Sequence, residues 1–322
     1  MLNKNKLPFF LKFVISFGLL FALLWIMRGS IKNIAEILKT SNKVFFGLAF
    51  LLNTTLTIFL SLRLRLLMSS QKIALSLKDA LYLTYIGYFF NNFLPTAIGG
   101  DIAKAYYASK KTDNNIESYA AVVTDRLCGL ASLLMIALVG LVFFGNSLGN
   151  KKIVWAVIAM AAFIISLIVL LLNKRIEHKK DPAKSGILNA LALKFSKLYN
   201  AVNAYKGAPL VLIKAILISL ISHAGAILGV YLFILGLGGG INFIKLFLIV
   251  PLVWTVSMLP SLNGLGVREG AFVYFLKGDL GADMAFTVSL LWLGIVIAFG
   301  IIGGVLHLLY PVNIKKQQKE TS

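Results

Sequence analysis

Long apolar runs separated by short charged segments make up most of this 322-residue sequence. A transmembrane helix needs roughly 20 consecutive apolar residues, and six of the runs approach that length. They cover residues 9–27, 44–62, 117–144, 153–172, 208–236 and 285–310. None of them alternates apolar and polar residues, as the strands of a membrane β-barrel would. The pattern therefore predicts an all-α polytopic membrane protein with about six full transmembrane helices.

Two further apolar segments, residues 79–100 and 244–277, are interrupted by amides, prolines, glycines and charges. The first break contains Asn91, Asn92, Leu94-Pro95, Gly99, Gly100 and Asp101. The second contains Leu259-Pro260, Asn263, Gly264, Gly266, Arg268 and Glu269. Irregular backbone at membrane depth is tolerated only where it is buried in protein or lines a cavity. Broken apolar helices at corresponding places in two halves of a chain indicate a transporter binding site.

Basic residues determine the predicted orientation. The net charge is +20, and lysine and arginine concentrate between the apolar runs, eight of them within 174–206. Because cytoplasmic loops carry an excess of these residues, the N- and C-termini are expected in the cytoplasm. A full crossing by 79–100 would put the cluster at 174–206 outside. Both broken segments are therefore predicted to be re-entrant hairpins, the first entering from inside and the second from outside.

The two hairpins belong to a predicted inverted repeat within a single membrane domain, residues 1–322. A shift of 165 residues carries Leu94-Pro95 onto Leu259-Pro260 and the span at 44 onto the one at 209. The half-repeats cover about 44–144 and 209–310, with opposite orientations. Between them, the basic segment 173–207 contains an amphipathic stretch. It is predicted to be a helix that either lies on the membrane surface or packs on the inner face of the protein.

Charged groups in or next to the apolar segments are the first candidates for a site. Each costs roughly 2.5–3.5 kcal/mol at membrane depth, so it usually faces a partner or water. The candidates are Asp101, Asp125, Arg126, Arg268 and Glu269. We expect a polar cavity between the hairpin tips, where arginine binds phosphate oxygens bidentately and carboxylates balance the charge. The alternative is that these groups only pair with one another and join the two halves.

The other polar residues of the breaks have structural explanations as well as functional ones. The amides either cap the broken helix arms or contact a ligand; they are Asn91, Asn92 and Asn263. The glycines permit the backbone to turn, with ligand contact as a secondary role; they are Gly99, Gly100, Gly264 and Gly266. His223 either relays protons or makes a hydrogen bond between helices. No metal-binding cluster, catalytic set or phosphate loop occurs in the sequence, so no metal or cofactor is expected.

Three motifs carry a resemblance to a known family. They are Asn91-Asn92-Phe93-Leu94-Pro95 through Gly99-Gly100-Asp101, Asp125-Arg126-Leu127-Cys128-Gly129-Leu130, and Gly264-Leu265-Gly266-Val267-Arg268-Glu269-Gly270. In their order and spacing the sequence resembles the flippase-like membrane domain of the lysylphosphatidylglycerol synthase (multiple peptide resistance factor) family. The resemblance implies a bacterial inner-membrane protein that handles lipids. In two-domain members, the membrane part is thought to move aminoacylated phosphatidylglycerol between leaflets. No aminoacyl-transferase domain follows the last span here, so lipid lysinylation is not expected.

The leading hypothesis is a lipid translocase that moves a phospholipid or lipid-linked substrate between leaflets, with its site between the broken helices. Two alternatives are a membrane-embedded enzyme acting on a lipid or polyprenyl substrate, and a non-catalytic subunit of envelope machinery. Anionic phospholipid is the expected partner, and no nucleic acid is expected. A second copy of the chain and an envelope-biosynthesis protein stay open as protein partners.

Overall fold

The computed structural model describes residues 31–93, 99–112, 115–145, 187–259, 261 and 263–309, and ten isolated positions between 21 and 166. These ranges are helical with short connections and contain no strand, so the all-α polytopic class is confirmed. Four of the helices are long and apolar enough to cross a membrane. They are α3 (Lys43–Ser70), α6 (Asn115–Phe144), α9 (Pro209–Gly236) and α12 (Ala282–Leu309). The spans expected at 9–27 and 153–172 lie outside the described residues, apart from the isolated positions.

Each predicted break separates two shorter helices. The first pair is α4 (Leu77–Phe93) and α5 (Gly99–Thr112), and the second is α10 (Phe243–Val256) and α11 (Val267–Leu280). The first hairpin extends beyond the predicted segment 79–100, because the basic stretch that follows residue 100 is helical and not a loop. That stretch is α5, the returning arm. Because α5 is polar, hydropathy does not identify it as a buried helix; its burial comes from packing against both α4 and α6.

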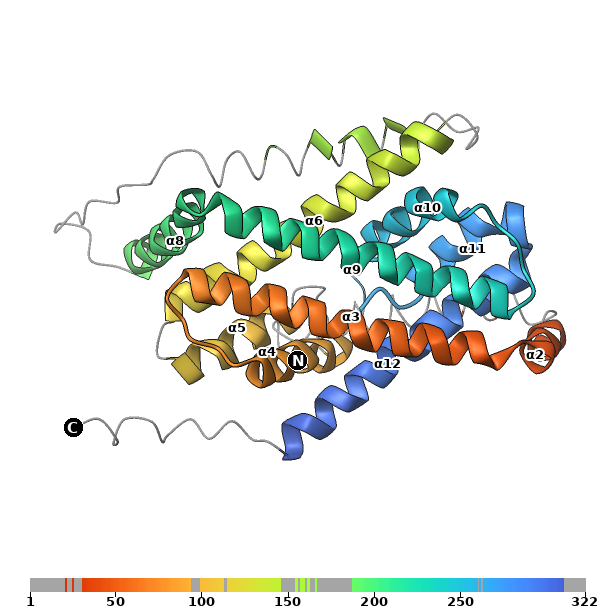
Figure 1. Cartoon of the computed structure of the whole chain (residues 1–322), viewed down its shortest axis with the longest axis horizontal. Helices are drawn as coiled ribbons and strands as arrows, with labels where there is room; N and C mark the ends of the chain where they lie inside the picture. Colours follow the sequence, from red (N-terminus) through yellow and green to blue (C-terminus); the bar gives the residue numbers. More distant parts are fainter. Residues whose placement is uncertain are drawn as a thin grey trace, which may run out of the picture.

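The central helices α3 and α9 run antiparallel. At one end, the backbone N–H of Asn42 donates to the carbonyl of Gly236 at 2.8 Å. At the other, the phenol of Tyr205 donates to the carbonyl of Leu67 at 2.8 Å. Figure 1 shows α4 and α5 at the end where α3 finishes and α9 begins, and α10 and α11 at the opposite end. Each broken pair therefore enters and leaves the bundle at one end, as the hairpin prediction requires.

The last span of each half packs on the hairpin of the other half. Helix α6 contacts α10, and α12 contacts α4. Both crossings are close because a glycine faces backbone: Gly140 lies against Phe247 and Leu248, and Gly303 lies against Tyr85. Small residues permit such close approach of membrane helices. The contacts of α5 with α6 and of α11 with α12 complete the same pattern in both halves.

Large apolar side chains cover the outward faces of the spans. On α9 they form one stripe with spacings of three to seven residues: Leu210, Ile213, Leu217, Ile221 and Leu228. Such a stripe is one face of a helix. In a membrane protein, acyl chains cover a surface of this kind.

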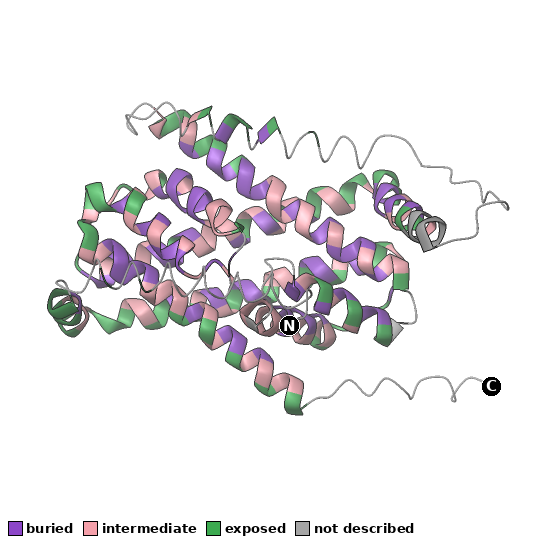
Figure 2. Ribbon diagram, turned by 180° about the vertical axis from the view of Figure 1, so that it is seen from behind, coloured by how far each residue is buried: buried purple, intermediate pink, exposed green. Residues whose placement is uncertain are grey.

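Three shorter elements lie at the ends of the bundle. Helix α2 (Ile31–Thr40) falls where a polar connection was expected and is largely exposed (Figure 2). Helix α8 (Ile187–Asn203) is followed by the 3₁₀ helix η3 (Ala204–Gly207) and packs on α6. Tyr199 and Val202 of α8 are buried, whereas Phe195 is exposed. The expected amphipathic helix is thus present, and one side of it contacts the protein.

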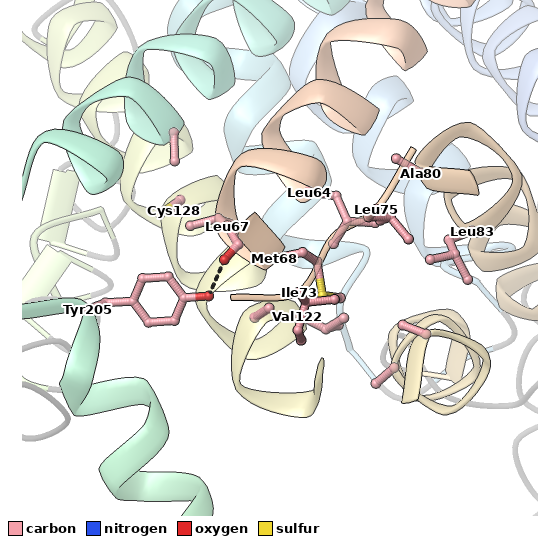
Figure 3. Close-up of a cluster of buried hydrophobic side chains, with 14 residues drawn as sticks. Leu64, Leu67, Met68, Ile73, Leu75, Ala80, Leu83, Val122, Cys128 and Tyr205 are labelled. Atoms are coloured by element: carbon pink, nitrogen blue, oxygen red, sulfur yellow. Dashed lines mark hydrogen bonds between the residues drawn. The ribbon is translucent and has the colours of Figure 1, made fainter. Parts of the chain in front are cut away.

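A buried cluster fixes η3 against the end of α3. Leu64, Leu67 and Met68 contribute to it, and the ring of Tyr205 points toward the carbonyl of Leu67 (Figure 3). Burial raises the pKa of the Tyr205 phenol well above its usual value. The phenol therefore stays protonated and remains a hydrogen-bond donor at neutral pH.

Candidate functional site: a charged cavity beside the first hairpin

A cavity of about 200 Å³ lies beside the first hairpin. Its walls come from α3, α4, α5, α6 and α9, with Met258 at the second break. Five lining residues are charged: Arg63, Asp101, Lys104, Asp125 and Arg126. Three of the charged candidates from the sequence, Asp101, Asp125 and Arg126, are thus brought together around one space.

The ion pair between Arg63 and Asp125 is the tightest in the cavity. Nε of Arg63 lies 2.6 Å from Oδ1 of Asp125, and both side chains are less than a tenth exposed. Nη1 of Arg63 also donates to Oγ of Ser219 at 2.6 Å. These contacts join α3, α6 and α9, so they fix one wall of the cavity.

The remaining three charges are held more loosely. Nζ of Lys104 lies 3.6 Å from Oδ1 of Asp101 and 3.8 Å from Oδ2 of Asp125. Nη1 of Arg126 lies 3.6 Å from Oδ2 of Asp101. All three distances exceed hydrogen-bond length. Oδ2 of Asp101 is shielded from solvent and accepts no hydrogen bond from the described residues. Lys104 and Arg126 can therefore turn toward a bound anion at low cost.

Two of these cations, Arg63 and Lys104, were missed as site residues. Both were counted among cytoplasmic loop charges, because the apolar run ends at Leu62 and the segment after Gly100 is polar. The structure places them inside α3 and α5. Polar residues recur every fourth position in α3 at Asn53, Thr57 and Ser61, and all three are buried. The same spacing continues to Arg65, which is exposed, so this periodicity does not identify Arg63 as a buried residue.

Asn91 and Gly100 close the tip of the first hairpin. Oδ1 of Asn91 accepts a hydrogen bond from the N–H of Gly100 at 2.8 Å, and so caps the first turn of α5, which begins at Gly99. A side chain at position 100 would meet the carbonyl of Gly87 and the amide of Asn91. Asn91 also lines the cavity, so capping and ligand contact are compatible roles for it.

The tips of the two hairpins touch through a pair of amides. Nδ2 of Asn263 donates to Oδ1 of Asn92 at 2.6 Å, and Nδ2 of Asn92 donates to the carbonyl of Val296 on α12 at 3.0 Å. The second tip turns through left-handed conformations at Gly264 (φ 76°) and Gly266 (φ 79°). Glycine adopts these conformations without steric cost, which accounts for both residues as turn formers.

Arg268 and Glu269 pair with each other at the start of α11. Oε1 of Glu269 accepts from Nη2 of Arg268 at 2.6 Å, and Oε2 accepts from the N–H of Gly266 at 2.6 Å. Both residues are buried, and neither lines the cavity. The arrangement differs from the expected site between both tips, because Glu269 turns back to cap its own helix and neutralises the adjacent arginine.

His223 lies at the cavity wall on α9. Its Nδ1 is 2.9 Å from Oγ of Ser132 on α6, and its ring centroid is 5.8 Å from that of Trp254. This geometry matches the expected hydrogen bond between helices. Among the described residues, no group of three or more His, Cys, Asp or Glu side chains could hold a metal ion.

Comparison with known proteins identifies the family. The model of the lysylphosphatidylglycerol synthase TM region matches residues 9–304. The chain belongs to this family. It is 26% identical to the UPF0104 membrane protein PH1989 of Pyrococcus horikoshii, across 93% of this chain and 96% of that protein. It is 27% identical to the UPF0104 membrane protein MJ1078 of Methanocaldococcus jannaschii, across 72% of this chain and 98% of that protein.

In this member of the lysylphosphatidylglycerol synthase TM region family, the cavity is suited to binding an anion. Its lining residues carry three cations and two carboxylates, which leaves one positive charge in excess when His223 is counted as neutral. The side chain of Arg126 is 38% exposed, so water screens part of this excess charge. A single anionic group entering the cavity would neutralise it.

Proposed function

We propose that this protein moves lipids with a phosphate-containing headgroup between the leaflets of its membrane, and that the headgroup binds in the charged cavity. The observation that carries the proposal is the unbalanced positive charge in a cavity walled by helices that cross the membrane or re-enter it. Polar and charged groups at membrane depth mark substrate pathways by default. Membership of the family supports a membrane protein, and the cavity supports the choice of substrate.

The size of the cavity supports binding of a headgroup only. At about 200 Å³ it accommodates several water molecules. It is smaller than the roughly 300–1,000 Å³ of sites that enclose whole drug-sized ligands. We therefore place the acyl chains outside, along the apolar outer faces of the helices, while the headgroup crosses through the interior.

The three cations would have different roles in binding the headgroup. Arg63 is held by Asp125 and Ser219, so it supplies a fixed positive potential. Lys104 and Arg126 make no such short contact with the described residues and would supply the direct contacts to phosphate oxygens. The distribution of basic residues supports cytoplasmic N- and C-termini, and the resemblance to the lysylphosphatidylglycerol synthase family is the basis for placing the protein in a bacterial inner membrane.

Lipid flipping in proteoliposomes tests the proposal. Purified protein is reconstituted with a trace of NBD-labelled phosphatidylglycerol, and dithionite then destroys the fluorescence of the outer leaflet only. Wild type is expected to bring inner-leaflet label within reach of dithionite, and Lys104→Gln is expected to slow this markedly. Lys245→Gln is the matched control, because Lys245 forms an ion pair with Asp279 away from the cavity.

Two results would count against translocation through this cavity. One is the absence of flipping with wild type, with or without an ion gradient. The other is equal loss of flipping in Lys104→Gln and Lys245→Gln when both variants are folded.

A further inference from the structure

We propose that the cavity selects headgroups with one negative charge, which are phosphodiesters, and that Asp101 sets this preference. The inference rests on the proposed function and deepens it by naming the chemical class of the headgroup. It begins from the charge count of the lining residues, in which one positive charge is unmatched.

The two carboxylates of the cavity have different surroundings. Asp125 is committed to Arg63 by a contact of 2.6 Å. Asp101 makes no contact of that kind with any residue that the structure describes. Its Oδ1 faces Lys104 and its Oδ2 faces Arg126, each at 3.6 Å. Asp101 therefore lies between the two cations that would contact a phosphate, and it neutralises one unit of their charge without binding either tightly.

In this position the carboxylate of Asp101 neutralises the positive charge that a second negative charge on the ligand would otherwise meet. A phosphodiester brings one negative charge and neutralises the cavity. A phosphomonoester carries up to two charges at neutral pH and would leave the cavity negative. A zwitterionic headgroup leaves the excess positive charge in place, and an aminoacylated cationic headgroup adds to it. The arrangement thus favours an unmodified anionic phospholipid over an aminoacylated one.

Removing the Asp101 charge should change this preference in a defined direction. Asp101→Asn keeps the size of the side chain and raises the net charge of the cavity by one unit, so the affinity for dianions should rise relative to the affinity for monoanions. A charge within 4–6 Å shifts the equilibria of ionised groups by one to three powers of ten. We therefore expect the affinity ratio of dianion to monoanion to rise at least about tenfold. Lys104→Gln makes the opposite change and should abolish the preference for a monoanion over a zwitterion.

Binding of soluble headgroup analogues measures this preference independently of transport. Calorimetry on the detergent-solubilised protein would compare glycerophosphoglycerol (a monoanion), glycerol 3-phosphate at pH 7.5 (mainly a dianion) and glycerophosphocholine (a zwitterion). Wild type should bind glycerophosphoglycerol most tightly, and Asp101→Asn should favour glycerol 3-phosphate. Asp279→Asn, which removes a carboxylate outside the cavity, should match wild type. A second arm measures the flipping of phosphatidylglycerol and of phosphatidic acid. Flipping with the same charge preference would identify a lipid as the ligand, whereas binding of the soluble analogues without flipping would indicate a free phosphate ester.

The outcomes separate the two proposals. Equal binding of all three analogues by wild type, or an unchanged order in folded Asp101→Asn and Lys104→Gln, would overturn the charge-selection inference even if lipids are flipped. The expected order of binding without flipping of any lipid would support the inference about the cavity and refute translocation.

Discussion

The buried ion pair of Arg63 and Asp125 allows a quantitative test of how the bundle is held together. At a separation of 2.6 Å and an effective dielectric constant of about 20, their Coulomb attraction is about 6 kcal/mol. Desolvation of the two buried groups offsets much of this attraction. Removing Asp125 nevertheless leaves Arg63 as an uncompensated buried charge, which costs about 3–5 kcal/mol, whereas removing Arg63 leaves Asp125 with Lys104 at 3.8 Å. We expect Asp125→Leu to lower the free energy of unfolding by roughly that amount and Arg63→Met to lower it by less.

The double variant should recover most of the loss caused by Asp125→Leu, because it removes both charges of the pair. A double-mutant cycle is therefore expected to give a coupling energy of at least about 3 kcal/mol. Unfolding in mixed detergent micelles, followed by circular dichroism, measures each corner of the cycle.

A second ion pair provides the control. Lys245 and Asp279 are separated by 2.7 Å, nearly the same distance, but their side chains are 20% and 27% exposed. Water screens a pair of this kind, so its coupling energy should be about 1 kcal/mol or less. The reasoning is wrong if the two cycles give equal coupling energies, since burial is the only feature offered to explain the difference.

Two further predictions concern the close helix crossings and the buried phenol of Tyr205. Gly140→Ala and Gly303→Ala should each lower the free energy of unfolding by more than about 2 kcal/mol in the same assay, since the new methyl group would meet backbone. Gly294→Ala is the control and should be neutral or stabilising, because its methyl group would meet nothing within 4 Å. Equal effects at the three positions would refute the close crossings. Because burial raises the pKa of Tyr205, its contribution to stability is complete below its unfolded pKa of about 10 and is lost as the pH rises toward the folded value. Tyr205→Phe should cost about 1 kcal/mol at pH 7 and should remove part of the loss of stability at alkaline pH; an unchanged alkaline profile would contradict the buried donor.

Local composition was enough to predict the four described spans and both breaks. Hydropathy reports each apolar run directly, and the distribution of basic residues placed the two hairpins at opposite ends. Helix α5 was missed because its residues are polar and its burial comes from α4 and α6, which a search for apolar runs does not detect.

The candidate site was only partly predictable, because its pairs are set by contacts distant in the sequence. Arg63 is recognisable as a buried group only through Asp125, which lies 62 residues later in the chain. Arg268 and Glu269 were predicted either to line the site or to pair with another charge, and the sequence could not decide between these roles. In the structure their charges pair with each other, and neither residue lines the cavity.

The exchange of packing partners between the halves has a consequence for biogenesis. Helix α4 finds its most extensive partner in α12, which is synthesised roughly 200 residues later. At a translation rate of about 5–20 residues per second, that interval is roughly 10–40 s. During this time the first hairpin has been made but lacks the helix that covers it, and among the described helices synthesised before α8 it has α3 and α6 as packing partners. Insertion of the final span therefore completes the first half of the protein as well as the second.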